Sequence, residues 1–374
     1  MGVKDRLSRR DVLRSAVALV AGIACESSLR GEVHGDLAEA KDEGWVVGNE
    51  LIRRVVGFHP GVGLYTKQIS NRATMTDLLV PGRDIKKARP EFSFNCDGKL
   101  CNSNGGDFEL VGVSDASTSN GKSLSVRMRH KNILLEVNAL YSIYTGHGAC
   151  RKSLVLKNTG DAPLRITHLM VETLELGLGP ENEMTLWAQY GAVPREIFYT
   201  GRSEDAGVMV VNGRTGDGVA ILNEVPGYMK RTEVAGWDAE NSVRVSAMYD
   251  TDVMPFERRL GPGEEFTTAS VSLLPFRRDD GFNDSRWRVP CYSAEVLERR
   301  IDKQGPPWIY NTWEPFERGI NQEISMELIE AAGAMGMDIF TIDDGWQQEY
   351  VDNAVNLTAF PGGLDPILKA VEAK

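Results

Sequence analysis

The sequence of 374 residues is long enough for two or three domains, and its hydrophobic content of 42% is ordinary for a globular protein. A formal net charge of −11 argues against nucleic acid or an anionic membrane surface as a partner. No apolar run approaches the roughly 20 residues that a membrane-spanning helix needs.

The first 25 residues predict an export signal rather than a part of the fold. Residues 8–14 are close to the twin-arginine pattern, and a weakly apolar run follows at residues 15–24. We therefore expect export by the twin-arginine route to a periplasmic or extracellular location; the alternative is a disordered basic tail. Cleavage after Ala24 would expose Cys25, so a lipid anchor at Cys25 stays open, although Gly22 replaces the usual leucine.

Four further cysteines lie beyond the export signal. Cys96 and Cys101 are separated by a turn-like spacer, which allows either a disulfide bridge or two free thiols. Cys150 and Cys291 lie in or beside apolar runs and are expected in the core. No cysteine spacing resembles a zinc site.

Residues 45–290 predict a large antiparallel β-sandwich. Short apolar runs, several with alternating polar residues, are separated by Gly, Pro and Asn. Turns are expected at residues 158–163 and 261–264. The expected strands include residues 123–129, part of 133–144, 153–157, 164–166, 207–211, 218–222 and 266–274.

Aromatic and histidine side chains of this region have two interpretations. Residues 186–190, which contain Trp187, and Trp237 lie among turn residues; they are expected either in the core or at a neighbouring active site. The histidines are scattered without metal-like spacing and are expected at the surface or in the core; they are His59, His130, His147 and His168.

Residues 291–306 are expected to link the sandwich to the last part of the chain. Residues 293–303 have the apolar spacing of a helix, and Gly305, Pro306 and Pro307 would end it.

Residues 308–346 predict two parallel strands joined by a helix. Apolar runs near residues 308–312 and 338–342 flank an amphipathic segment. Asn321 is expected to cap the start of this helix and Gly336 to end it. The apolar stripe expected to face the strands comprises Ile324, Leu328, Ala332 and Met335.

Five side chains follow these two strands and are predicted to meet at the carboxyl ends of the strands. They are the candidate substrate-binding residues Trp313, Glu314, Asp343, Asp344 and Trp346. Carboxylates accept hydrogen bonds from hydroxyl groups, and an indole ring covers the apolar C–H face of a pyranose, so the combination suits a sugar. The alternatives are that the aspartates stabilise a helix N-terminus and that Glu314 anchors a loop.

Three motifs carry a resemblance to a known family. Residues 311–314, 343–346 and 360–364 resemble, in this order, the Asn-Ser/Thr-Trp-Glu, Asp-Asp-Gly-Trp and Phe-Pro-x-Gly-Leu segments of the melibiases, the α-galactosidases of glycoside hydrolase family 36. Upstream, the turn motifs at residues 59–64, 158–161 and 261–264 resemble the supersandwich of that family. The resemblance covers the chain from about residue 45. It implies a multi-domain fold, with an antiparallel β-supersandwich at residues 45–290 and the beginning of a TIM (β/α)8 barrel at residues 307–374, of which only the first two β/α units are present.

The resemblance implies a retaining hydrolase that removes terminal α-galactosyl residues from oligosaccharides. Asp343 and Asp344 match a pair that hydrogen-bonds galactose hydroxyls, and Trp313 and Trp346 match aromatics that shape the pocket. Retention needs two carboxyl groups roughly 5 Å apart. In the family these follow later strands, so the nucleophile and the acid/base are expected beyond residue 374. Neither a metal nor an organic cofactor is expected.

The resemblance also implies an incomplete barrel. A complete barrel takes on the order of 250 residues, whereas about 70 lie between Pro307 and Lys374. We therefore expect an N-terminal portion, truncated within the catalytic barrel, that hydrolyses no glycoside by itself and is poorly ordered over residues 309–368 in solution.

Other functions stay open at this point. They are an α-N-acetylgalactosaminidase, a raffinose-synthase-like α-galactosyl transferase and a non-catalytic carbohydrate-binding β-sandwich. Asp343 and Asp344 are not expected to act as the catalytic pair, because adjacent residues after a strand point in divergent directions. A homo-oligomeric assembly is also left open by the sequence.

Overall fold

The computed structural model describes most of the chain after residue 43 and divides it into two compact units, residues 1–297 and 298–374. The described residues are 44–79, 84–85, 88–179, 183–190, 193–197, 202–203, 207–224, 232–234, 242–246, 255–297, 307–349 and 353–374. The predicted export signal, Cys25 and Trp237 lie outside these ranges.

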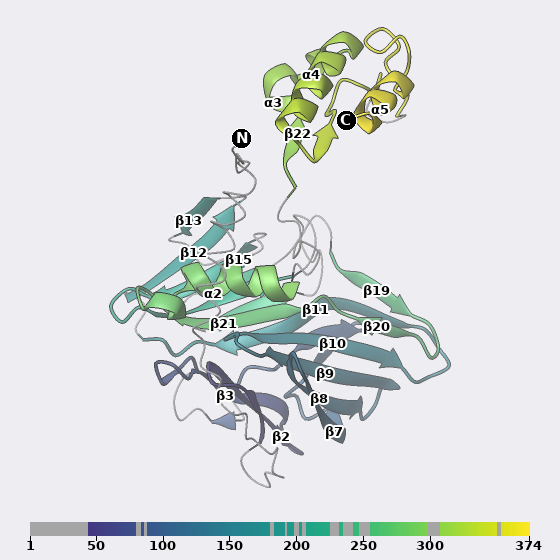
Figure 1. The fold of residues 1–374 in the computed structure, drawn as a ribbon. Coiled ribbons are helices and arrows are strands. Elements are labelled where there is room, and N and C mark those ends of the chain that lie inside the picture. Colours follow the sequence, from purple (N-terminus) through teal and green to yellow (C-terminus); the bar gives the residue numbers. More distant parts are fainter. Residues whose placement is uncertain are drawn as a thin grey trace. The chain divides into compact units, whose positions relative to one another are not determined.

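The first unit contains three antiparallel sheets among its described residues (Figure 1). The four-stranded sheet has the order β1-β2-β3-β4, with bounds Trp45–Gly48, Ile52–His59, Gly63–Asn71 and Thr76–Asp77. The ten-stranded sheet has the order β13-β12-β15-β16-β21-β10-β9-β8-β7, and β20 also pairs with β10. In that order, and ending with β20, the bounds are Val193–Ile197, Met184–Tyr190, Gly207–Asn212, Asp217–Asn223, Val271–Arg277, Cys150–Asn158, Leu135–Tyr144, Gly121–His130, Phe108–Thr118 and Glu265–Thr267.

The seven-stranded sheet has the order β14-β17-β18-β11-β5-β6, and β19 also pairs with β11. Its bounds, in that order and ending with β19, are Arg202–Ser203, Thr232–Val234, Ser242–Ser246, Leu164–Glu175, Ser93–Cys96, Lys99–Asn102 and Glu257–Leu260. The three sheets together confirm the predicted antiparallel β architecture of the first unit.

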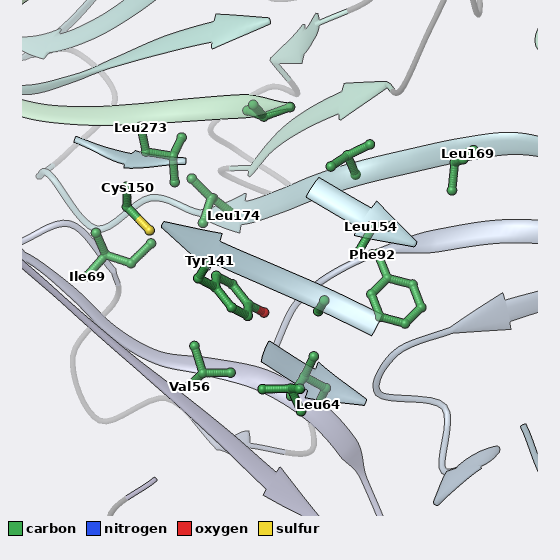
Figure 2. Close-up of a cluster of buried hydrophobic side chains, with 14 of the residues drawn as sticks. Val56, Leu64, Ile69, Phe92, Tyr141, Cys150, Leu154, Leu169, Leu174 and Leu273 are labelled. Carbon is green, nitrogen blue, oxygen red and sulfur yellow. The ribbon is translucent and has the colours of Figure 1, made fainter. Parts of the chain in front are cut away.

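Alternating burial along the central strands explains the sandwich. In β9 and β10 every second side chain is buried, as expected for strands with one face on a core. The inward side chains of β9 are Leu135, Val137, Ala139, Tyr141 and Ile143. Figure 2 shows Tyr141 of β9 among aliphatic side chains of other strands, including Val56, Leu64 and Leu154. Each fully buried aliphatic side chain of this kind contributes roughly 1.5–3 kcal/mol.

A buried group of charged side chains joins all three sheets. Arg54 of β2 donates to Glu172 of β11 (2.7 and 3.0 Å) and to Glu91 (2.7 Å), which lies just before β5. Lys152 of β10 donates to the same two carboxylates at 2.8 and 3.2 Å, and Tyr141 donates to Glu91 at 2.7 Å. All five side chains are essentially inaccessible to solvent. Two cations and two carboxylates thus compensate one another in the interior, where an unpaired charge would be costly.

Two strand predictions differ from the structure. Residues 266–274 form the end of β20 and the start of β21 rather than one strand, with β20 paired to β10 and β21 to both β10 and β16. Trp187 lies within β12 and not among turns; it is half-buried and packs against a core cluster that includes Phe276 and Tyr292.

Helix α2 (Ser285–Tyr292) follows a short 3-10 turn, η3 (Gly281–Asn283), and runs into a π-turn, η4 (Ser293–Leu297). It begins earlier than the helix predicted at residue 293, because Asp284 caps it by accepting from the Arg286 N–H at 2.8 Å. Figure 1 shows α2 lying along β21, where the buried Tyr292 hydroxyl lies 2.8 Å from the Ser272 hydroxyl.

The second unit has a short parallel sheet with one helix between its strands. β22 (Ile309–Asn311) pairs in parallel with β23 (Ile339–Thr341), and α4 (Gln322–Met335) lies between them in the sequence. α3 (Trp313–Phe316) and the 3-10 turn η5 (Glu317–Gly319) precede α4, and α5 (Asp365–Glu372) follows β23. Its core is formed by Ile320, Ile329, Phe360 and Ile367.

Both ends of α4 lie where they were predicted, and one residue of its predicted apolar stripe, Met335, is exposed. The Asn321 side chain accepts from the Ile324 N–H, and Gly336 ends the helix in the left-handed conformation with φ 74°. Ala332 is buried as predicted, but Met335 is 55% exposed. Ile324 and Leu328 are half-buried and pack against the core as predicted, and Ser325 and Ile329 are buried beside them.

Candidate functional site

The two parallel strands of the second unit end at the same level. Asn311, the last residue of β22, pairs in register with Thr341, the last residue of β23. The Thr312 N–H donates to the Thr341 carbonyl at 3.2 Å and so extends the pairing by one step. Residues that follow either strand therefore emerge at one common edge, as in parallel α/β units generally.

Asp343 is held at this edge by three hydrogen bonds. Its Oδ2 accepts from the Asn311 Nδ2 at 2.8 Å, and its Oδ1 accepts from the Asp344 N–H at 2.9 Å. The Asp343 N–H donates to the hydroxyl of Thr312 at 3.0 Å, and Thr312 itself is completely buried. Contacts from both strand ends thus fix the main chain and the carboxylate of Asp343.

These contacts also set the charge of Asp343. The hydrogen bond from the Asn311 amide, followed by that from the Asp344 N–H, lowers the pKa of the Asp343 carboxyl below its usual range. Asp343 is therefore ionised at neutral pH. Each of its oxygens already accepts one hydrogen bond and can accept another from a ligand hydroxyl.

Asp344 and Gly345 continue the same turn. The Gln347 Nε2 lies 3.4 Å from the Asp344 Oδ1. Gly345 has a φ of 106°, and a Cβ at this position would lie 2.7 Å from the Arg318 carbonyl oxygen. Only glycine fits this close approach, so the backbone conformation and the nearby Arg318 carbonyl explain the glycine of the Asp-Asp-Gly-Trp segment.

The remaining predicted site residues are placed differently from one another. Trp313 follows β22, is 38% exposed, and donates its N–H to the Asn311 Oδ1 at 2.7 Å. Glu314 is exposed, and the described part of the chain offers it no hydrogen bond or ion pair. Trp346 is half-buried and packs against the core of the second unit. The Asn311 side chain is therefore hydrogen-bonded to both Trp313 and Asp343, whereas Trp346 packs against the core of the second unit.

Asn311 and Thr312 belong to one of the sequence motifs, but the motif alone predicts no role for either. In the structure both contact Asp343 directly, across 31 or 32 positions in the sequence. The sequence signal that could have identified them is two short polar residues at the end of an apolar strand. Such short side chains can contact only the end of the neighbouring strand.

The histidines of the first unit occupy separate places. His59 and His168 are exposed, whereas His147 lies 3.0 Å from Glu295 and His130 is buried, accepting from two backbone N–H groups. Within the described ranges no three potential metal ligands lie together. In the same ranges no helix has the length and apolar character needed to cross a bilayer.

Cys96 and Cys101 are free thiols in the structure, on the two strands of the β5–β6 hairpin. In register, Cys96 lies opposite Lys99 and Cys101 opposite Phe94. Burial raises the pKa of Cys96 to about 12 and that of Cys101 to about 11. Cys150 is fully buried, as predicted, and Cys291 is half-buried.

Comparisons with known proteins agree with the resemblance noted in the sequence. No family model matches the chain. The α-galactosidase AgaA of Geobacillus stearothermophilus is 23% identical over 333 residues, covering 82% of this chain and 43% of AgaA. The bifunctional α-galactosidase/sucrose kinase AgaSK of Mediterraneibacter gnavus is 21% identical over 295 residues, covering 71% of this chain and 31% of AgaSK.

A solved structure extends this similarity to the fold. The family 36 α-galactosidase AgaA in complex with 1-deoxygalactonojirimycin has a TM-score of 0.60 at 16% identity, covering 88% of this chain and 55% of AgaA. The chain thus spans less than half the length of the two curated relatives AgaA and AgaSK. In sequence the chain is similar to α-galactosidases, and its fold is similar to that of glycoside hydrolase family 36 α-galactosidases over a part that includes their N-terminal β-sandwich region.

Proposed function

We propose that this chain is the N-terminal part of a retaining α-galactosidase, an enzyme that removes terminal α-galactosyl residues from oligosaccharides. The observation that carries the proposal is the meeting of Asp343 with Asn311 at two parallel strand ends, in a chain similar to curated α-galactosidases. An ionised carboxylate at such an edge suits the hydroxyl groups of a sugar.

We further propose that β22, α4, β23 and α5 are the first two units of a (β/α)8 barrel. Phe340 packs against the core of the second unit. Ile309 and Ile339 pair with each other one position earlier in β22 and β23, and they are 55% and 44% exposed. In a closed barrel such side chains point inward and are covered by the other strands. A barrel would therefore explain why Ile309 and Ile339 are exposed in these two strands.

Within this proposal, Asp343 and Asp344 accept hydrogen bonds from galactose hydroxyls. The exposed Trp313 covers an apolar face of the sugar, and Trp346 forms a wall that is braced by the core. Glu314 is available as a further acceptor. The nucleophile and the acid/base of the retaining mechanism come from barrel strands outside these residues, so the present chain by itself turns over no α-galactoside.

The test uses the protein made from its complete reading frame and p-nitrophenyl α-galactoside as substrate. We expect hydrolysis with retention, and we expect Asp343→Ala and Asp344→Ala to lower kcat/KM by about 10- to 100-fold, the effect of losing hydrogen bonds to a charged group. The α-N-acetylgalactosaminide and galactosyl transfer to sucrose are assayed in parallel. Faster turnover of either, or no turnover of any α-galactoside, contradicts the proposal.

We also propose export by the twin-arginine route, on the pattern at residues 8–14. Replacing Arg9 and Arg10 with Lys is expected to retain the protein in the cytoplasm. The measurement is the distribution of the protein between cytoplasmic and periplasmic or secreted fractions. Normal export of the double variant would count against this route.

A further inference from the structure

We propose that Asn311 is a positioning residue that holds the Asp343 carboxylate and the Trp313 main chain in one fixed arrangement for the sugar. The inference rests on the proposed α-galactosidase function and deepens it, because it adds a residue that contacts no substrate itself. It is carried by the two hydrogen bonds of the Asn311 side chain.

The orientation of the Asn311 amide follows from its partners. The Trp313 N–H can only donate, and it lies 2.7 Å from the Asn311 Oδ1. The other end of the amide must therefore be the NH2 group, which faces the Asp343 Oδ2 at 2.8 Å. One planar group thus fixes the spacing between the start of α3, where Trp313 lies, and the carboxylate after β23.

The same contacts leave Asp343 prepared for a ligand. Its Oδ1 is held by the Asp344 N–H, and its main chain is held by the buried Thr312 hydroxyl. The carboxylate therefore has its orientation before any sugar arrives. Without Asn311 the side chain would keep only the bond to its own neighbour and could rotate.

Asn311 is suited to this role rather than to a part in the core. It is exposed at the end of β22, whereas the next residue, Thr312, is completely buried. Asn311→Ala therefore removes the two hydrogen bonds without opening the interior. This separates positioning from folding in an experiment.

The variant that tests the inference is Asn311→Asp. The new carboxylate still accepts from the Trp313 N–H but faces the Asp343 carboxylate at hydrogen-bond distance. Two such carboxylates share one proton, so the pKa of the pair rises. In the complete protein, kcat/KM for p-nitrophenyl α-galactoside is expected to fall about 10-fold or more at pH 7 and to recover as the pH is lowered.

The matched control is Asn356→Asp in the same unit. The Asn356 Oδ1 accepts from the N–H groups of Thr358 and Ala359 at 3.1 and 3.2 Å, and an aspartate can reproduce both contacts. Because no hydrogen bond joins the Asn356 side chain to a carboxylate among the described residues, its variant is expected to change kcat/KM by less than about twofold at every pH.

A second measurement, made on the complete protein, separates the inference from the proposed function. The carboxyl carbon of Asp343 is titrated by NMR in the wild type, in Asn311→Ala and in Asn311→Asp. We expect the pKa of Asp343 to rise in Asn311→Ala and to rise further in Asn311→Asp. An unchanged titration, or wild-type pH dependence of an active Asn311→Asp enzyme, overturns the inference while the function stands. A complete protein that hydrolyses no α-galactoside overturns the function, whatever the titration shows.

Discussion

At the scale of single residues, the second unit depends on backbone positions that few side chains tolerate. Gly345 is the clearest case, because it combines a φ of 106° with a carbonyl oxygen that would lie 2.7 Å from an added Cβ. The Arg318 carbonyl that it approaches lies in the turn before α4, so this glycine connects the Asp343 turn to a distant segment of the same unit. The turn that contains Asp343 is thus packed against the main chain at Arg318.

Gly345→Ala is therefore expected to destabilise the second unit by about 2 kcal/mol or more, from the left-handed backbone and the contact with Arg318 together. Gly336→Ala is the control, since its φ is 74° and no atom lies within 4 Å of the added Cβ. It should cost about 1 kcal/mol. Urea unfolding followed by NMR signals of the second unit compares the two. Equal losses would mean that the contact at Gly345 has no effect.

The buried thiols lead to a second residue-scale prediction. Because burial raises the pKa values of Cys96, Cys101 and Cys150 to between about 11 and about 12, few thiolates form at pH 8. Among the four described cysteines, we expect iodoacetamide to label Cys291 first and the other three only after unfolding. Peptide mass spectrometry without reductant gives the labelling order. A disulfide-linked peptide containing Cys96 and Cys101 would contradict the prediction.

At the scale of elements, local signals in the sequence are sufficient where an element is defined by its own residues. The sequence predicts helix α4 and both of its ends, because Asn321 and Gly336 each end the helix through contacts with residues of the adjacent turn. It does not predict the burial of Ser325, because apolar character alone does not identify every buried position. Ser325 is buried, since its hydroxyl is satisfied by donating to the Asn321 carbonyl at 2.7 Å.

The site shows the same limit. The meeting of residues after β22 and β23 follows from the parallel arrangement and is predictable. The hydrogen bond from Asn311 to Asp343 is not predictable, because it joins residues 32 positions apart and depends on the register of the two strands. The sequence does not encode that register locally. Likewise, Trp187 lies in a strand rather than among turns, since the pairing of β12 with β15 is a long-range property.

The cap of α4 provides an element-scale prediction. Asn321→Ala removes the acceptor for the Ile324 N–H and is expected to lower the free energy of unfolding of the second unit by about 1 kcal/mol. Asn321→Asp keeps a cap acceptor at a helix N-terminus and should be close to neutral. Hydrogen exchange at Ile324 reports the loss locally. An unchanged exchange rate in Asn321→Ala would argue against the cap.

At the scale of the whole molecule, the buried charges are the feature that the sequence conceals most completely. Arg54 and Glu172 are 118 positions apart, and the formal charge of −11 gives no hint that two cations and two carboxylates lie in the interior. Alternation along each strand predicts which faces are buried, but it treats Lys152 as one more polar residue. Long-range pairing decides which charges are compensated.

This group makes the stability of the first unit dependent on pH. Burial by itself would raise the pKa of Glu91, but Arg54 and Lys152 outweigh burial and hold it well below the usual value of 4.5. Stability from this carboxylate is therefore complete above about pH 4.5 and is lost as the pH falls below that value. Urea unfolding between pH 7 and pH 3 should show a falling midpoint. A constant midpoint would contradict this.

Glu91→Gln tests the same group at constant pH. It leaves two buried cations facing one carboxylate and is expected to cost about 3–5 kcal/mol at pH 7. Glu265→Gln is the control, because Glu265 pairs with Lys157 at the surface and is 54% exposed. Its loss should lie below about 1 kcal/mol. Similar unfolding midpoints for the two variants would show that the interior pairs are not compensated as described.

The joining of three sheets by Arg54, Lys152, Glu91 and Glu172 has a consequence for how the first unit is assembled. A pair of sheets that docked without the third would enclose a charge lacking its partner, so half-built intermediates are penalised. The sandwich is therefore expected to form and to melt in an all-or-none manner, with no sheet persisting alone.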